Sequence, residues 1–241
     1  MNRNYKAIGL ALVAMFALGA FVAQGASASP LTIEGIANGT VFVKGDQGGG
    51  EHEFKSAAGT VKCKEAEFPG SGTVKEGKVE ELTVTPTYKS CTAFGFATAH
   101  VKMNGCTYTF TTPTSLGSGK VTWNGASQLH LVCPSEKVIE ITPTSFGVSV
   151  CTLTIAAQTP TGEAGKESHV VGSNSGTPTA MHVFLDITLF GIHYIGHGAP
   201  CDPEPGGVKT TTQINGSLIG KSTVKCYKNE LRTEQVGCTF S

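Results

Sequence analysis

His193 and His197 have the spacing of a helical metal-binding pair. Three glycines around them, Gly191, Gly196 and Gly198, disfavour a helix at this point. On an extended strand, residues four apart are separated by about 13 Å, which is too far for both to bind one ion. We therefore interpret these residues as histidines at the end of a strand and expect no metal site.

His182 and Asp186 share one face of the same apolar stretch. A catalytic dyad needs side chains within hydrogen-bonding reach, and a strand again separates them by about 13 Å. Asp186 is nevertheless one of three aspartates and has apolar neighbours. A carboxylate bonded to a nearby Thr or Lys is the simpler interpretation, and a functional carboxylate is the alternative.

Two further patterns resemble catalytic motifs. The pairs Glu51/Glu53 and Glu65/Glu67 place carboxylates about 6.6 Å apart on one strand face, and glycosidases use two carboxylates. Any strand with alternating Glu gives this spacing, so we favour a solvated face. Residues 222–225 match S-x-x-K, but on a strand the Ser and the Lys face opposite sides.

Residues 1–28 have the features of a secretory signal peptide. Arg3 and Lys6 precede an apolar run over residues 7–23, and Ala26-Ser27-Ala28 forms an A-x-A cleavage site. A retained membrane anchor is the alternative, but the run is short for a span of about 20 residues. We expect a mature chain of residues 29–241 that is secreted or associated with the cell envelope, with no membrane contact after cleavage.

The composition excludes several classes of protein. The 241 residues include 18 Lys+Arg and 18 Asp+Glu, and only 15% are charged. Because phosphate recognition needs clustered basic residues, a nucleic-acid partner is not expected. The apolar fraction of 39% is too high for a disordered chain.

The cysteines indicate a disulfide framework. Their number is even and all follow the signal peptide, which in an oxidising compartment predicts four disulfides. No C-x-x-C pair is present, so we expect neither zinc nor redox chemistry, and no cofactor. The eight are Cys63, Cys91, Cys106, Cys133, Cys151, Cys201, Cys226 and Cys238.

A short internal sequence repeat suggests how the cysteines pair. Residues 82–88 and 139–145 are both alternating runs that contain Thr-Pro-Thr, and each lies between two cysteines. Eight cysteines allow 105 connectivities, so the pairing is a hypothesis. A duplication would give the bridges Cys63–Cys91 and Cys133–Cys151, which leaves Cys106–Cys201 and Cys226–Cys238.

The mature chain has short alternating runs separated by Gly, Pro, Ser and Asn. This pattern predicts an all-β, antiparallel β-sandwich-like fold with disulfides, as one large domain or two packed modules divided near 113–120. Asn104-Gly105 suits a type I′ turn and predicts a hairpin over residues 98–110, in which Ala99 faces Phe110. Residues 181–195 are predicted to form one central strand.

Five segments of the chain form a set that matches one group of proteins. They are Gly59–Cys63, Leu82–Tyr88 with Cys91–Gly95, Val101–Phe110, Leu131–Pro134 and Cys151–Ile155. Through them the chain resembles secreted, cysteine-containing, β-rich proteins of high-GC actinobacteria, a group with no assigned activity. The resemblance covers roughly residues 59–157. It implies export and a disulfide-linked β fold, and it implies no ligand or catalytic residue.

Our first functional hypothesis is an exported, non-enzymatic structural or binding protein, whose partner is a surface glycan or another exported protein. Trp123 is the candidate aromatic platform for a sugar, although a core Trp is the simpler interpretation. The alternatives are a secreted hydrolase with a site around Asp186, His182 and His193 or the Glu pairs, and a disulfide-stabilised inhibitor presenting residues 200–207.

Overall fold

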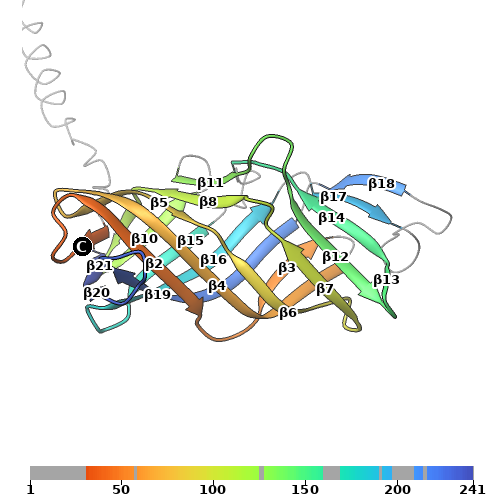
Figure 1. The fold of residues 1–241 in the computed structure, drawn as a ribbon, viewed down its shortest axis with the longest axis horizontal. Helices are drawn as coiled ribbons and strands as arrows, with labels where there is room; N and C mark the ends of the chain where they lie inside the picture. Colours follow the sequence, from red (N-terminus) through yellow and green to blue (C-terminus); the bar gives the residue numbers. More distant parts are fainter. Residues whose placement is uncertain are drawn as a thin grey trace, which may run out of the picture.

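The fold is an antiparallel β structure (Figure 1). The computed structural model describes residues 31–56, 59–124, 128–159, 169–189, 192–196, 209–213 and 216–240. The predicted signal peptide, residues 1–28, lies outside the described residues. The predicted all-β, antiparallel, sandwich-like fold with disulfides is confirmed.

The strands are short, apart from a few long ones. The first eleven are β1 (Leu31–Ile33), β2 (Gly39–Gln47), β3 (His52–Ser56), β4 (Gly59–Lys75), β5 (Lys78–Val84), β6 (Thr87–Ala93), β7 (Ala97–Lys102), β8 (Thr107–Thr111), β9 (Thr114–Gly117), β10 (Lys120–Asn124) and β11 (Leu129–Val132). The others are β12 (Ile139–Ser145), β13 (Val148–Ser149), β14 (Cys151–Ile155), β15 (His169–Asn174), β16 (Ala180–Leu189), β17 (Ile192–Gly196), β18 (Lys209–Gln213), β19 (Gly216–Tyr227), β20 (Gln235–Val236) and β21 (Cys238–Phe240).

The strands form two lobes that share β4 and β19. Lobe 1 has the order β9-β10-β15-β16-β19-β2-β4-β5-β8-β11, with β1 paired to the start of β5 and β21 paired to β1. Lobe 2 continues from β19 through β3 and the first half of β4 to β6-β7-β12-β14-β17-β18. Figure 1 shows lobe 1 at the left and lobe 2 at the right.

The sheet of lobe 1 curls until its two halves face each other. Trp123 of β10 meets Phe110 of β8 across the interior, with ring centroids 5.6 Å apart. Strands alternate buried and exposed residues, as expected where one face packs and the other is solvated. Val41 and Val43 of β2, for example, are fully buried, while their neighbours are partly or fully exposed.

Residues 98–110 contain the predicted turn, but the predicted pairing of the two strands beside it is wrong. Asn104 and Gly105 both have positive φ, and the Cys106 N–H donates to the Met103 carbonyl at 2.8 Å. The flanking strands then separate, because β7 pairs with β6 and β12, whereas β8 pairs with β5 and β11. The chain passes from lobe 2 to lobe 1 at this turn.

Residues 181–195 form two strands instead of the predicted single one. β16 pairs with β15 and β19 in lobe 1, and β17 pairs with β14 and β18 in lobe 2. Met181, Leu185 and Ile187 are buried on the inward face of β16, and His182 and Asp186 share its outer face, as predicted.

Three disulfides lie wholly within the described residues. Cys63–Cys91 and Cys226–Cys238 are confirmed. The predicted Cys133–Cys151 and Cys106–Cys201 bridges are wrong, because Cys106 bonds to Cys133. Cys151 is also disulfide-bonded, and Cys201 lies outside the described residues.

The pairing of β8 with β11 explains the Cys106–Cys133 bridge. Thr107 lies opposite Val132 at the end of the ladder. Cys106, just before Thr107, and Cys133, just after Val132, are therefore neighbours. The Thr-Pro-Thr repeat is not a structural duplication, since Pro86 lies between β5 and β6, whereas Pro143 lies inside β12 opposite Ala99.

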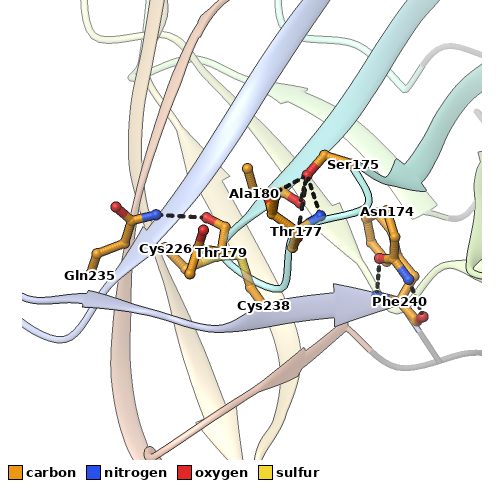
Figure 2. Close-up of a disulfide and its surroundings, with 9 residues drawn as sticks. All are labelled: Asn174, Ser175, Thr177, Thr179, Ala180, Cys226, Gln235, Cys238 and Phe240. Carbon is orange, nitrogen blue, oxygen red and sulfur yellow. Dashed lines mark hydrogen bonds between the residues drawn. A yellow bond between two sulfur atoms is a disulfide. The ribbon is translucent and has the colours of Figure 1, made fainter.

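The C-terminal strand β21 is held at both ends (Figure 2). Cys238 is bonded to Cys226 of β19. The Asn174 side chain accepts from the Phe240 N–H at 2.8 Å and donates to the Phe240 carbonyl at 3.0 Å. The segment predicted to divide two modules, residues 113–120, contains β9 and the turn to β10, and the division stays a prediction.

Candidate functional site

The three residues of the predicted hydrolase site point into solvent. His182 and Asp186 are exposed on the outer face of β16, and His193 is exposed on β17. His182 lines a shallow groove with Phe184 and Lys221 that includes neither Asp186 nor His193. The His182 Nδ1 lies 3.4 Å from the Thr223 hydroxyl. This arrangement brings no acid–base pair together.

The glutamates of the carboxylate pairs have cationic or hydroxyl partners on the surface. Glu53 lies 3.0 Å from the Lys62 ammonium and 3.1 Å from that of Lys55. Hydrogen bonds to these lysines hold the pKa of Glu53 below its ordinary value, so its carboxylate is a poor proton donor. Glu51 also lies within 3.7 Å of Lys62. These pairs therefore match the solvated-face interpretation.

The other pair has similar partners. Glu67 lies 3.6 Å from the Lys89 ammonium, and Glu65 accepts a hydrogen bond from Ser90 at 2.9 Å.

The inhibitor loop predicted at residues 200–207 lies outside the described residues, as does His197. No group of three or more His, Cys, Asp or Glu within the described ranges could hold a metal ion.

Trp123 is buried, with 5% of its surface exposed. Its indole N–H donates to the Thr111 carbonyl at 2.7 Å. Its ring makes edge-to-face contacts with Phe110 and Phe240, both with centroids 5.6 Å away. In this position the ring is part of the interior of lobe 1 and offers no face to a surface glycan.

Trp123 borders a cavity of about 50 Å³ between the two halves of lobe 1. A space of this size exceeds what one water molecule needs, and empty cavities with apolar walls remain dry and take up apolar molecules. The lining comes from both halves of the curled sheet: Val43, Phe68, Leu82, Val84, Phe110, Trp123, Val183, Leu185, Ser222 and Val224.

Ser222 is the one polar residue in this lining. It is 4% exposed, and its hydroxyl has no hydrogen-bond partner among the described residues. An unpaired buried hydroxyl costs on the order of 1–3 kcal/mol. A ligand whose single polar group reached this hydroxyl would remove the cost.

A second set of buried polar groups lies next to the cavity wall. His52 of β3 is fully buried and packs against Phe68 and Tyr88, with ring centroids 5.0 and 6.1 Å away. Its Nε2–H donates to the Lys221 carbonyl at 3.1 Å, and its Nδ1 has no partner in the described part of the chain. Burial lowers the pKa of His52, although the bond to Lys221 opposes this.

The phenols of Tyr88 and Tyr108 are also buried without partners among the residues described. Burial raises the pKa of both, and for Tyr88 the nearby Tyr108 adds to the effect. Both side chains are therefore neutral at physiological pH and cannot serve as anionic bases.

Trp123 could be singled out from the sequence, but the cavity that it borders could not. Its other walls are Val, Leu and Phe at alternating strand positions, which look the same as any core residue. Ser222 was noticed only as part of S-x-x-K. The signal that could have identified it is its place on the inward face of β19, with Leu218 and Cys226.

Comparisons with family models, curated proteins and solved structures found no match to this chain. Over the described ranges, no helix has the length and apolar character needed to span a membrane. Disulfides persist in oxidising compartments, and the bridges seen here place the folded chain in such an environment.

Proposed function

We propose that this protein is an exported, non-enzymatic binding protein, and that the cavity of lobe 1 holds a small apolar ligand with one polar group. The observation that carries the proposal is the cavity, with apolar walls and the unpaired Ser222 hydroxyl. Export is supported by the disulfides and by the signal-peptide pattern of residues 1–28.

The chemistry of the cavity favours an apolar ligand over a glycan. A sugar carries many hydroxyls, and each would lose its hydrogen bonds to water in a space that has one hydroxyl to offer. The volume of about 50 Å³ suits a ligand of a few heavy atoms, since the apolar cavities that take up an aromatic ring measure about 150 Å³. A short-chain alcohol would fill the cavity and pair with Ser222.

No observation favours the hydrolase. Its residues His182, Asp186 and His193 do not converge, and the surface carboxylates are bonded to lysines or to Ser90. A surface glycan or another exported protein remains a prediction from the sequence, and the groove beside His182 and Phe184 is where we would test for it.

The only tryptophan of the chain makes a direct test simple. Because Trp123 borders the cavity, a bound bromine atom would quench its fluorescence. We expect saturable quenching by bromoethane, and tighter binding of 2-bromoethanol because its hydroxyl can pair with Ser222. Ser222→Ala should remove the difference between the two probes.

Val183→Phe places extra volume in the cavity and should abolish saturable quenching. Val132→Phe is the matched control, since Val132 is 50% exposed and is not part of the cavity lining. Quenching that is linear in probe concentration, or equal in the protein and its Val183→Phe variant, would contradict the proposal.

A further inference from the structure

Three hairpin turns of lobe 2 lie at the same end of its sheet. They join β3 to β4, β6 to β7 and β12 to β13. Val61 of β4 lies opposite Ala93 of β6, and Thr98 of β7 lies opposite Thr144 of β12, so the turns beyond these residues are neighbours. In Figure 1 the β6–β7 and β12–β13 turns project at the lower right.

The β6–β7 and β12–β13 turns expose large apolar side chains. Phe96 is 64% exposed, Val148 is 67% exposed and Phe146 is fully exposed. We call these three residues the apolar tip. Phe94 supports it from behind, because its ring covers Gly59, where a Cβ would stand 2.5 Å from the ring, and its centroid lies 6.5 Å from that of Phe96.

The backbone at the tip is unfavourable for phenylalanine. Phe94 has φ of 57° and Phe146 has φ of 50°, in the left-handed region that Asn and Gly adopt more readily. The buried part of the Phe94 ring gains packing in return. The Phe146 ring packs on nothing within the fold, so its presence costs both backbone strain and exposed apolar surface.

The turn ends of the three hairpins carry no charged side chain. Residues 56–61, 90–99 and 141–155 contain no Asp, Glu, Lys or Arg, in a chain of which 15% of residues are charged. A partner that recognises this end of the molecule is therefore apolar and uncharged at the contact, and ion pairs have no part in the recognition.

The size of the tip distinguishes between such partners. Its three side chains offer on the order of 400 Å², since an aromatic side chain buries about 150–250 Å². A stable protein complex buries about 800 Å² on each partner. A lipid surface makes no such demand, because a few apolar side chains entering the acyl boundary give weak, reversible binding.

We propose that the apolar tip inserts into the interfacial region of a zwitterionic lipid surface and docks the protein there reversibly. This departs from the sequence-based expectation of no membrane contact. The tip belongs to lobe 2 and the cavity to lobe 1, so either proposal can fail without the other.

Flotation with phosphatidylcholine vesicles tests the proposal. We expect the mature protein to float with the vesicles, and Phe96→Ser combined with Phe146→Ser to lower the partition coefficient on the order of tenfold or more. The matched control is Leu116→Ser with Leu231→Ser, which removes two exposed leucines elsewhere, 56% and 84% exposed, and should leave the partition unchanged.

Phe146→Asn separates a binding role from a folding role. Asn accepts positive φ, so this variant should melt higher by about 2–4 °C while binding vesicles less. Because the tip is uncharged, binding should be the same in about 0.1 M and about 1 M NaCl. Three results would overturn the proposal. They are loss of vesicle binding at high salt, equal vesicle binding by the double Phe→Ser variant and the double Leu→Ser control, and dimerisation through the tip in sedimentation experiments.

Discussion

The His52 ring of β3 lies directly against Gly220 of β19. A Cβ on Gly220 would stand 2.1 Å from the His52 Nδ1 and 2.3 Å from its Cε1. The two strands are paired, with Glu53 opposite Ile219, so neither residue can move away without breaking the ladder. The fully buried imidazole fits between β3 and β19 only because position 220 has no side chain.

Gly220→Ala should therefore destabilise the protein by about 1–3 kcal/mol, the usual cost of overpacking a core. His52→Ala should make the same substitution much less costly, because it removes the ring that the new methyl group meets. Urea unfolding of the two single variants and the double variant measures this coupling. Strictly additive effects would show that the ring and the glycine are energetically independent.

The buried His52 should make stability depend on pH. Its pKa in the folded protein is lowered from the ordinary value of 6.5, so below pH 6.5 the unfolded chain binds a proton that the folded chain does not. The free energy of unfolding is then unaffected by His52 above pH 6.5 and falls as the pH drops below it, by at most about 1.4 kcal/mol per pH unit.

Urea unfolding at pH 7.5 and pH 5.5 tests this dependence. His52→Phe should flatten the response between these two conditions, and the exposed His100→Gln should leave it unchanged. An unaltered pH dependence in His52→Phe would assign the effect to other groups.

The Cys106–Cys133 bridge closes a loop with a sequence separation of 27. On the chain-entropy model, replacing both cysteines with Ala should lower the free energy of unfolding by about 3–4 kcal/mol. The Cys226–Cys238 bridge, with a separation of 12, should cost slightly less, about 3 kcal/mol. Mass spectrometry of a non-reduced digest provides the direct check, and a peptide linking Cys133 to Cys151 would refute the pairing.

Asn174 should control the order of the C-terminal strand. Its amide makes two hydrogen bonds to the backbone of Phe240, whose ring packs on Trp123. Asn174→Ala should cost about 1–3 kcal/mol and speed hydrogen exchange at the Phe240 amide. Asn174→Asp keeps the acceptor for this amide and should protect it more than Ala does. Equal exchange in all three proteins would show that the disulfide alone orders β21.

Local patterns predicted the strands because alternation depends on neighbours two residues apart. Ala99, Tyr108 and Phe110 are buried, as their positions beside Asn104-Gly105 indicated. The same turn did not reveal the partners of its strands, since β7 and β8 join different lobes. A type I′ turn sets the backbone over two residues and leaves later pairing to the rest of the sheet.

The sequence by itself determined the fold class, the inward faces of the segments that flank Asn104-Gly105 and the separation of His182 from Asp186. It offered the Cys63–Cys91 and Cys226–Cys238 bridges only as a hypothesis, which the structure bears out although the duplication behind it is absent. The tertiary structure alone decided that Cys106 bonds to Cys133, that Trp123 borders a cavity, that Ser222 is left unpaired and that Phe96 and Phe146 share one end of the molecule. The physical reason is range: alternation and turns act over a few residues, whereas a cavity or a surface patch is made by strands that are far apart in the chain and meet only when the sheet curls.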